Sequence, residues 1–204
     1  MFKVGGSLFD LADLRERLRP HFNSPAHQSV VLFGGGPSVD ELRQQTSHGS
    51  VDNVDAHWQA IDLMSHSAEC QSKCWPGIVL VRSIAELSET MTSPVALDIA
   101  HDLRMDGGST LPIGWEVTSD SIAAWLAHRI GASDLVLVKS VGGSEVILIE
   151  DAVAHGWVDD YFPRAASTLP AKRCALGWIN ARLNPADRVE LRFSSPSLAN
   201  DKAE

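Results

Sequence analysis

The chain has 204 residues, of which 44% are hydrophobic and 21% charged, and its formal net charge is −9. This composition is ordinary for a globular protein with a core of its own, and it excludes a largely disordered chain. The acidic balance argues against a nonspecific nucleic-acid binder, and no apolar run approaches the roughly 20 residues that span a bilayer.

The expected setting is the cytosol. The chain has three cysteines, an odd number, and its first residues read as a strand and a turn, not as a signal peptide. We expect one domain over residues 1–204, with a polar, frayed tail at residues 196–204.

Predicted strands and helices alternate along the chain. Strands are expected at residues 2–4, 29–33, 78–81, 95–99, 135–138 and 146–149, and late strands at 174–179 and 188–193 whose pairing is left open. Helices are expected at residues 8–18, 39–45, 53–68, 84–91 and 121–130, with Pro20 ending the first. The alternation, together with apolar runs such as VVLF and LVLV, predicts a mainly parallel sheet covered by helices on both faces.

Two of these strands end in glycine turns. The first reads Lys3-Val4-Gly5-Gly6-Ser7, and the second ends in Gly34, Gly35 and Gly36. In an open parallel sheet, ligands bind beyond the carboxyl ends of the strands, and glycine lets the backbone approach a phosphate closely. Lys3 would add a point charge to such a cleft. Ordinary strand–helix turns with an edge lysine are about equally compatible with the pattern.

Two further residues point toward the same edge of the sheet. Asp120 falls in the first turn of the helix expected at 121–130, where it either satisfies free N–H groups or orients lysines or a metal. Lys139 ends the buried strand at 135–138 and precedes another glycine turn. A desolvated lysine needs a charged partner, which Asp120 or a phosphate would supply. The sequence contains neither GxxxxGK[ST] nor a GxGxxG after the first strand.

The ordered set KVGGS, LFGGG, TSDSIAAWLA and VKSVGG resembles the amino acid kinase family over about residues 1–150. The resemblance implies a three-layer α/β/α sandwich and transfer of the γ-phosphoryl group of ATP, with Mg²⁺, to a carboxylate or phosphate. The stretches GGGPSVDELR and WEVTSDSIAAWLAHRIGASDLVLVKS are similar to a short subgroup that phosphorylates an aminomethylfuran phosphate in methanofuran synthesis. Bacterial relatives of that subgroup accompany one-carbon metabolism that uses tetrahydromethanopterin.

The resemblance also implies roles for individual residues. Lys3 corresponds to the lysine that contacts the transferred phosphoryl group, and Asp120 to the aspartate that positions the catalytic lysines. The loop around the ATP phosphates corresponds to Gly5, Gly6 and Ser7, and the loop near the acceptor to Gly34, Gly35 and Gly36. The nucleotide-base loop corresponds to Lys139, Ser140, Val141 and Gly143. A homo-oligomer is expected from the same resemblance.

The sequence departs from the family at two points. A late glycine-rich stretch with a further lysine is absent, since Lys172 lacks neighbouring glycines, and Gly142 stands where an aspartate is usual. Either Lys139 replaces the missing lysine, or ATP binding is altered or lost. The main hypothesis is therefore an ATP-dependent phosphotransferase with a small acceptor. The rival is a noncatalytic nucleotide or oxyanion binding protein on the same fold.

Several other residues are candidates for the acceptor side. His57 is either an acceptor contact or a hydrogen-bonded packing residue beside Trp58. Arg104, in a loop expected after residue 99, suits a phosphate clamp or a plain surface position. The adjacent carboxylates Asp159 and Asp160 are either solvated or hold a magnesium ion or an amine. A spacing of four favours one helical face for His66, Cys70 and Cys74, which is a weak signal for zinc.

Overall fold

The structure is a computed structural model that describes residues 1–23, 28–87, 93–106, 110–143 and 145–194. Its strands are β1 (Phe2–Val4), β2 (Val30–Phe33), β3 (Val79–Val81), β4 (Val95–Leu97), β5 (Asp134–Lys139), β6 (Ile147–Leu148), β7 (Ala175–Asn180) and β8 (Arg188–Arg192). Its α-helices are α1 (Leu14–Phe22), α2 (Pro37–Ser47), α3 (Asn53–Cys74), α4 (Ala100–Asp106), α5 (Ser119–Arg129), α6 (Ile149–Ala154) and α7 (Phe162–Ser167). Short 3₁₀ turns occupy η1 (Gly6–Leu8) and η2 (Ile84–Glu86).

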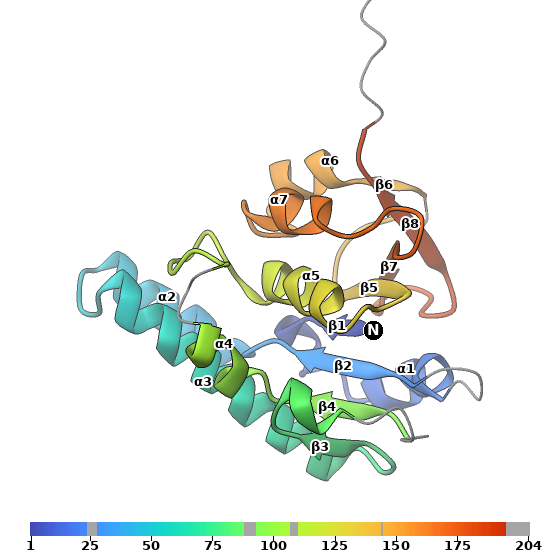
Figure 1. Ribbon diagram of the computed structural model, residues 1–204, viewed down its shortest axis with the longest axis horizontal. Helices are drawn as coiled ribbons and strands as arrows, with labels where there is room; N and C mark the ends of the chain where they lie inside the picture. The colour runs from blue at the N-terminus through green and yellow to red at the C-terminus, as the bar shows by residue number, and fades with distance from the viewer. Residues whose placement is uncertain (24–27, 88–92, 107–109, 144, 195–204) are drawn as a thin grey trace, which may run out of the picture.

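Within the described residues, eight strands form one sheet in the order β3-β4-β2-β1-β5-β7-β8-β6. All neighbouring strands are parallel except β7 and β8, which are antiparallel and settle the pairing that the sequence left open. Figure 1 shows β1, β2 and β5 in the middle of the molecule, with α2 and α3 toward one end and α6 and α7 toward the other. The predicted mainly parallel α/β/α arrangement is confirmed.

The sheet buries apolar side chains on both faces because successive residues of a strand point to opposite sides. In β2, Leu32 faces a core that includes Leu126 of α5. Its neighbours Val31 and Phe33 face a second core that includes Phe22 of α1. Each layer of helices therefore covers one set of alternate strand residues, and β1, β2 and β5 are held rigidly between them.

Two helical predictions need correction. The first helix begins at Leu14 and continues through Pro20. Proline has no N–H to donate within a helix, and α1 ends two residues after it, at Phe22. The loop expected after residue 99 is helical from Ala100, because the Asp98 carboxylate accepts a hydrogen bond from the Ala100 amide at 3.1 Å. Arg104 thus lies on α4, not in a loop.

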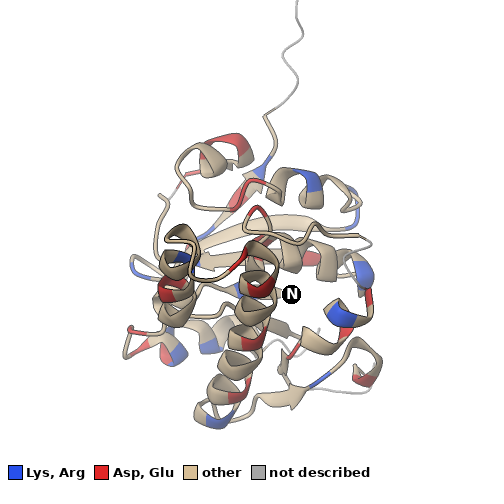
Figure 2. Ribbon diagram, turned by 90° about the vertical axis from the view of Figure 1, so that its left-hand side faces the viewer, with Lys and Arg blue, Asp and Glu red and all other residues tan. Residues whose placement is uncertain are grey.

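Other expectations fall partly or wholly outside the described residues. Of the helix expected at 84–91, the structure describes only its first part, which is the 3₁₀ turn η2. The Gly107-Gly108 pair and the tail predicted for 196–204 lie outside the described residues. None of the described helices is long and apolar enough to cross a membrane. Basic and acidic residues are interspersed along the outer helices (Figure 2).

Candidate active site

A cavity of about 440 Å³ lies at the carboxyl ends of β1, β2 and β5. It is lined by both glycine turns, by the first turn of α5 and by the loop at residues 156–160. Lys3, Asp120 and Lys139 line the same cavity. The structure therefore brings the amino-terminal lysine and the three consecutive glycines, which are separated by about thirty residues of sequence, to one place.

A buried ion cluster forms the floor of this cavity. Lys3 Nζ lies 2.9 Å from Asp120 Oδ1, as an ion pair and not as an aligned hydrogen bond. Lys139 Nζ donates to Asp120 Oδ2 at 2.6 Å and to the Trp157 carbonyl at 2.6 Å. All three charged side chains are buried. Asp120 thus holds two ammonium groups next to each other, an arrangement that favours an anionic ligand beside them.

The protonation of the cluster follows from burial and charge. Burial alone would raise the pKa of Asp120, but the Lys139 and Lys3 ammonium groups outweigh it and hold that pKa below its ordinary value. Burial lowers the pKa of Lys139 to about 8, although the attraction of Asp120 acts in the opposite direction. At neutral pH, Lys139 is therefore mainly a cation, although it holds its proton less firmly than an exposed lysine does.

The two glycine turns touch each other through their backbones. A Cβ on Gly6 would lie 2.3 Å from the Gly36 nitrogen, and one on Gly34 would lie 3.0 Å from the Gly6 nitrogen. Gly36 has a φ of 75°, a left-handed conformation that other residues adopt at a cost. Both turns therefore line the cavity with their backbones close together. Side chains at Gly6 and Gly34 would keep the two turns apart.

The start of α2 directly follows the second turn. Pro37 occupies the first position of this 11-residue helix, where its missing N–H costs nothing. The first turn leads into the short η1 instead, and α1 begins later at Leu14. An anion at the second turn therefore meets the positive end of a full helix, whereas one at the first turn meets backbone amides alone.

The loop at residues 140–143 lies beside the cavity. Of the residues that line the cavity, none belongs to this loop, so Ser140, Val141 and Gly143 are placed next to the site and not in its lining. Ser140 Oγ lies 3.0 Å from Ser7 Oγ, which joins this loop to the first glycine turn.

Two side chains of β7 donate hydrogen bonds to the same loop. Trp178 Nε1 donates to the Val141 carbonyl at 2.9 Å, and Asn180 Nδ2 donates to the Gly142 carbonyl at 2.7 Å. Gly142 has a φ of 96°, and a Cβ there would lie 2.5 Å from Trp178 Nε1. This packing gives a physical reason for glycine at the position where the resembling family usually carries aspartate.

Lys139 is a second lysine at this cavity, and Lys172 is not. Lys172 is exposed and is not among the residues that line the cavity. Lys139 reaches Asp120 from the end of β5 instead. The interpretation in which Lys139 takes the place of the late lysine requires a lysine beside Asp120, and Lys139 lies there.

The acceptor-side candidates divide into two groups. His57 lines the cavity, with Nδ1 3.2 Å from the Gly114 carbonyl, and burial lowers its pKa despite that contact. Arg104 does not line the cavity. Its guanidinium donates to Asp62 at 2.5 Å and lies over the Trp58 ring, so the structure does not bring it to the site.

Arg43 and Trp115 are among the residues of this cavity that sequence reasoning missed. Both line it, and the Arg43 guanidinium carbon lies 4.9 Å from the centre of the Trp115 ring. The Trp115 indole N–H is buried and has no hydrogen-bond partner among the described residues. Arg43 follows Gly36 by two helical turns of α2, a spacing that could have indicated it as a residue on the same face.

A metal site built from side chains alone is not found. No group of three or more His, Cys, Asp or Glu side chains in the described part of the chain could hold a metal ion. His66 Nε2 lies 3.4 Å from Cys70 Sγ, and Cys70 and Cys74 are exposed. Among the described residues, no fourth ligand that would complete a zinc site lies beside these three side chains. Magnesium commonly binds through substrate phosphates with one or two carboxylates, and Asp40 and Asp160 are carboxylates that line the cavity.

The comparison with solved structures agrees with this fold. No family profile matches the chain, and no curated protein sequence matches it. Among solved structures, the uridylate kinase from Archaeoglobus fulgidus is similar at 15% identity, 93% coverage of this chain and 90% of that chain, with a TM-score of 0.60. The UMP kinase from Ureaplasma parvum is similar at 12% identity, with 93% and 96% coverage and a TM-score of 0.59.

A third similar structure is the UMP kinase from Bacillus anthracis, at 12% identity, 93% and 94% coverage and a TM-score of 0.61. At such low identity these likenesses establish the fold alone. The chain has the fold of the amino acid kinases, to which the uridylate kinases belong. The similarity spans nearly the whole chain, beyond the roughly 150 residues from which the sequence resemblance was drawn.

Proposed function

We propose that the protein is an ATP-dependent kinase that transfers the γ-phosphoryl group to a small phosphorylated or carboxylated metabolite. The observation that carries this proposal is the joint placement of Lys3, Asp120, Lys139 and both glycine turns around one cavity. A phosphoryl group in transfer spreads negative charge over its oxygens, so catalysis depends on positioning and on positive charge held in advance. The uridylate kinase neighbours support a phosphotransferase on this fold.

In the proposed mechanism, the two ammonium groups that Asp120 holds face the transferred phosphoryl group. Gly5, Gly6 and Ser7 bind the ATP phosphates through backbone amides and the Ser7 hydroxyl. Gly34, Gly35 and Gly36 bind the transferred group and the acceptor, aided by the positive end of α2. Ser140, Val141 and Gly143 are proposed to border the nucleotide base. Mg²⁺ would offset the charge between the two anionic substrates.

The acceptor that we favour is an aminomethylfuran phosphate in one-carbon carrier biosynthesis, as the resemblance to the short subgroup implies. Three features of the cavity support a small planar, charged acceptor. Trp115 offers an aromatic face, Arg43 and His57 suit a phosphate group, and the Asp40 and Asp160 carboxylates suit an amine. A cytoplasmic location and a homo-oligomeric assembly belong to the same proposal.

The proposal is tested by an ADP-release assay on a panel of phosphorylated and carboxylated metabolites that includes the aminomethylfuran phosphate. We expect turnover with at least one of them and a loss of about a hundredfold to a thousandfold in Lys3→Met, because one contact to the developing charge is removed. Lys172→Met, at an exposed lysine away from the cavity, is the matched control and keeps full activity.

The rival proposal is a noncatalytic nucleotide or oxyanion binding protein. The altered loop at Gly142 favours it, because that loop differs from the family pattern. Equilibrium binding of an ATP analogue, measured in parallel, separates the two. Binding that depends on Lys3, with no ADP release on any acceptor, would favour the rival.

A further inference from the structure

Helix α5, which carries Asp120, begins without a cap from its own N-terminal residue. Thr118 occupies the N-cap position in an extended conformation, and its side chain makes no capping hydrogen bond to the helix. The first amides of a helix need acceptors, because they have no partner within the helix. The acceptor here comes from a distant part of the chain, the loop that follows α6.

Asp159 supplies this acceptor. Its Oδ2 accepts hydrogen bonds from the Thr118 amide at 3.0 Å, the Thr118 hydroxyl at 2.7 Å and the Ser121 amide at 3.1 Å. Its Oδ1 accepts a short hydrogen bond from the Ser121 hydroxyl. One carboxylate thus makes four contacts to two residues that flank Asp120 on either side, which fixes the first turn of α5 in both position and orientation.

The same loop also holds the second lysine of the ion cluster. The Trp157 carbonyl accepts a hydrogen bond from Lys139 Nζ at 2.6 Å, and Trp157 is two residues from Asp159. The loop is itself anchored to the segment before α5, because the Tyr161 amide donates to the Glu116 carbonyl at 3.1 Å. Residues 157–159 therefore contact Lys139 directly, through Trp157, and the first turn of α5 that carries Asp120, through the bonds of Asp159 to Thr118 and Ser121.

We propose that Asp159 is a positioning residue for the candidate active site, where its carboxylate fixes Asp120 through α5 and adds negative charge beside Lys139. For its kinetic consequences the inference rests on the proposed phosphoryl transfer. The structural part, which concerns Lys139 and α5, stands without any turnover. Asp159 lines the cavity but is already engaged by four donors, which distinguishes it from a carboxylate free to bind substrate.

Charges around Lys139 support this role. The groups that face its ammonium are Asp120, which attracts it, Lys3, which repels it, and Asp159, which attracts it more weakly. Burial, reinforced by the neighbouring Asp120 charge, raises the pKa of Asp159, although the Ser121 and Thr118 donors oppose that effect. Removal of the Asp159 charge is therefore expected to lower the pKa of Lys139.

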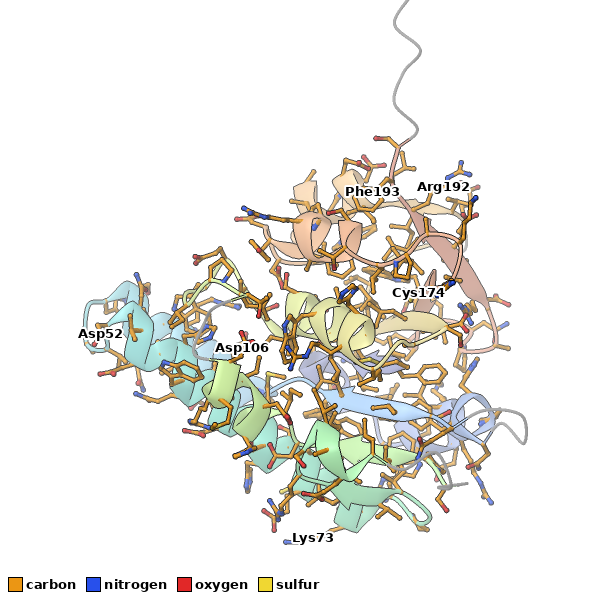
Figure 3. All side chains as sticks on the ribbon, viewed as in Figure 1. Asp52, Lys73, Asp106, Cys174, Arg192 and Phe193 are labelled. Carbon is orange, nitrogen blue, oxygen red and sulfur yellow. The ribbon has the colours of Figure 1, made fainter. Side chains whose placement is uncertain are left out.

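The test compares two substitutions at one position. Asp159→Asn keeps the shape and the backbone part of the cap, since its amide oxygen can accept from the Thr118 and Ser121 amides, while its NH₂ donates to the Ser121 hydroxyl and so reverses that one bond. It therefore removes the charge and largely preserves the cap. Asp159→Ala removes both charge and cap. Asp52→Ala is the matched control, because Asp52 caps α3 through the Val54 and Asp55 amides at 2.8 and 3.0 Å. Figure 3 places Asp52 at the outer end of the α2–α3 pair.

The first measurement is an NMR titration of the Lys139 side chain in the ligand-free protein. We expect the midpoint to fall by up to about one pH unit in Asp159→Asn, because an attractive charge is lost, and to stay unchanged in Asp52→Ala. The second is the pH–rate profile with ATP and an accepted substrate. Its alkaline limb moves down by the same amount in Asp159→Asn, and kcat falls about a hundredfold in Asp159→Ala, where the first turn of α5 is no longer fixed by its cap.

Two results would overturn the inference. One is a Lys139 titration that is the same in Asp159→Asn as in the native protein. The other is an Asp159→Ala protein that loses thermal stability as Asp52→Ala does but keeps native kcat. If no substrate supports turnover, the titration still decides the question, so failure of the proposed function and failure of this inference are told apart. If Asp159→Ala does not fold, the isosteric Asp159→Asn carries the test.

Discussion

One buried carboxylate, Asp120, serves two lysines that come from different strands. Lys3 lies in β1 and Lys139 ends β5, and the two strands are direct neighbours in the sheet. Burial makes each charge expensive unless it is paired, so removal of one member affects the others. The cluster is therefore a structural unit of the core and, under the proposed function, a catalytic one.

The shared carboxylate leads to a prediction about stability. Asp120→Asn leaves two buried ammonium groups without an ionic partner, and we expect a loss of about 3–5 kcal/mol in the free energy of unfolding at pH 7. Asp134→Asn is the control, because its pair with Arg188 at 2.6 Å is partly exposed and is worth about 1 kcal/mol or less. Equal losses in the two variants, measured by urea denaturation, would contradict the special role of Asp120.

The lowered pKa of Lys139 leads to a prediction about pH dependence. The group has to be protonated to attract the phosphoryl oxygens, and its pKa is about 8 in the ligand-free protein. We therefore expect kcat/KM to be constant below that value and to fall as the pH rises through it, because the cation is lost. A profile that stays flat to pH 10 would mean that Lys139 carries no catalytic charge.

At the scale of the elements, β1 and β2, each with the glycine turn that follows it, form one structural unit because the two turns are in contact. The Gly34 amide donates to the Val4 carbonyl at 2.9 Å, and the Gly5 amide donates to the Val138 carbonyl at 2.9 Å. These bonds continue the parallel ladders of β1 with β2 and β5 into the turns. The sheet thus sets the distance between the two glycine turns, which short loops alone would leave variable.

The close approach of the turns can be tested by Gly6→Ala. The added methyl group would meet the Gly36 backbone at 2.3 Å, so both turns have to move apart. We expect ATP turnover to fall sharply and stability to drop by about 1–3 kcal/mol. Gly49→Ala, with a φ of 74° but open space around its Cβ, is the control that strains the backbone and spares the cavity. Similar turnover in both variants would show that the contact is unimportant.

At the scale of the whole molecule, the cavity joins segments from the first, middle and last parts of the described chain. Residues 5–7, 34–36, 118–120 and 156–160 all line it. A ligand that contacts all of these segments bridges the α2–α3 pair and the loop after α6, which lie on opposite sides of the cavity. Binding is therefore expected to stabilise the folded chain as a unit and not one loop alone.

This expectation can be measured by thermal unfolding with Mg²⁺-ATP. At about a hundred times the dissociation constant, a ligand that binds the folded state adds about 2.7 kcal/mol, which raises the midpoint by roughly 5–10 °C in a chain of this size. Lys3→Met should reduce this shift strongly, whereas Lys172→Met should keep it. An equal shift in both variants would place the nucleotide elsewhere.

The sequence by itself determined most of the elements and the candidates at the strand ends. Apolar periodicity predicted β1 to β5 nearly in full, and it offered β6, β7 and β8 as further candidates, with the pairing of β7 and β8 left open. Glycines after β1 and β2, and lysines in β1 and β5, predicted a shared edge because parallel strands end on the same side. The sequence analysis misplaced the start of α1 and did not predict α4, α6 or α7. At α4 it overlooked a local cap, in which the Asp98 carboxylate accepts from the Ala100 amide.

The tertiary structure alone decided which residues meet. No local pattern shows that Lys139 shares Asp120 with Lys3, that Asp159 caps α5, or that Arg43 joins the cavity while Arg104 pairs with Asp62. The physical reason is that periodicity reports the environment along one element, whereas these distances are set by the order of strands in the sheet and by the packing between layers. Contacts between residues far apart in the chain exist only after the sheet has formed.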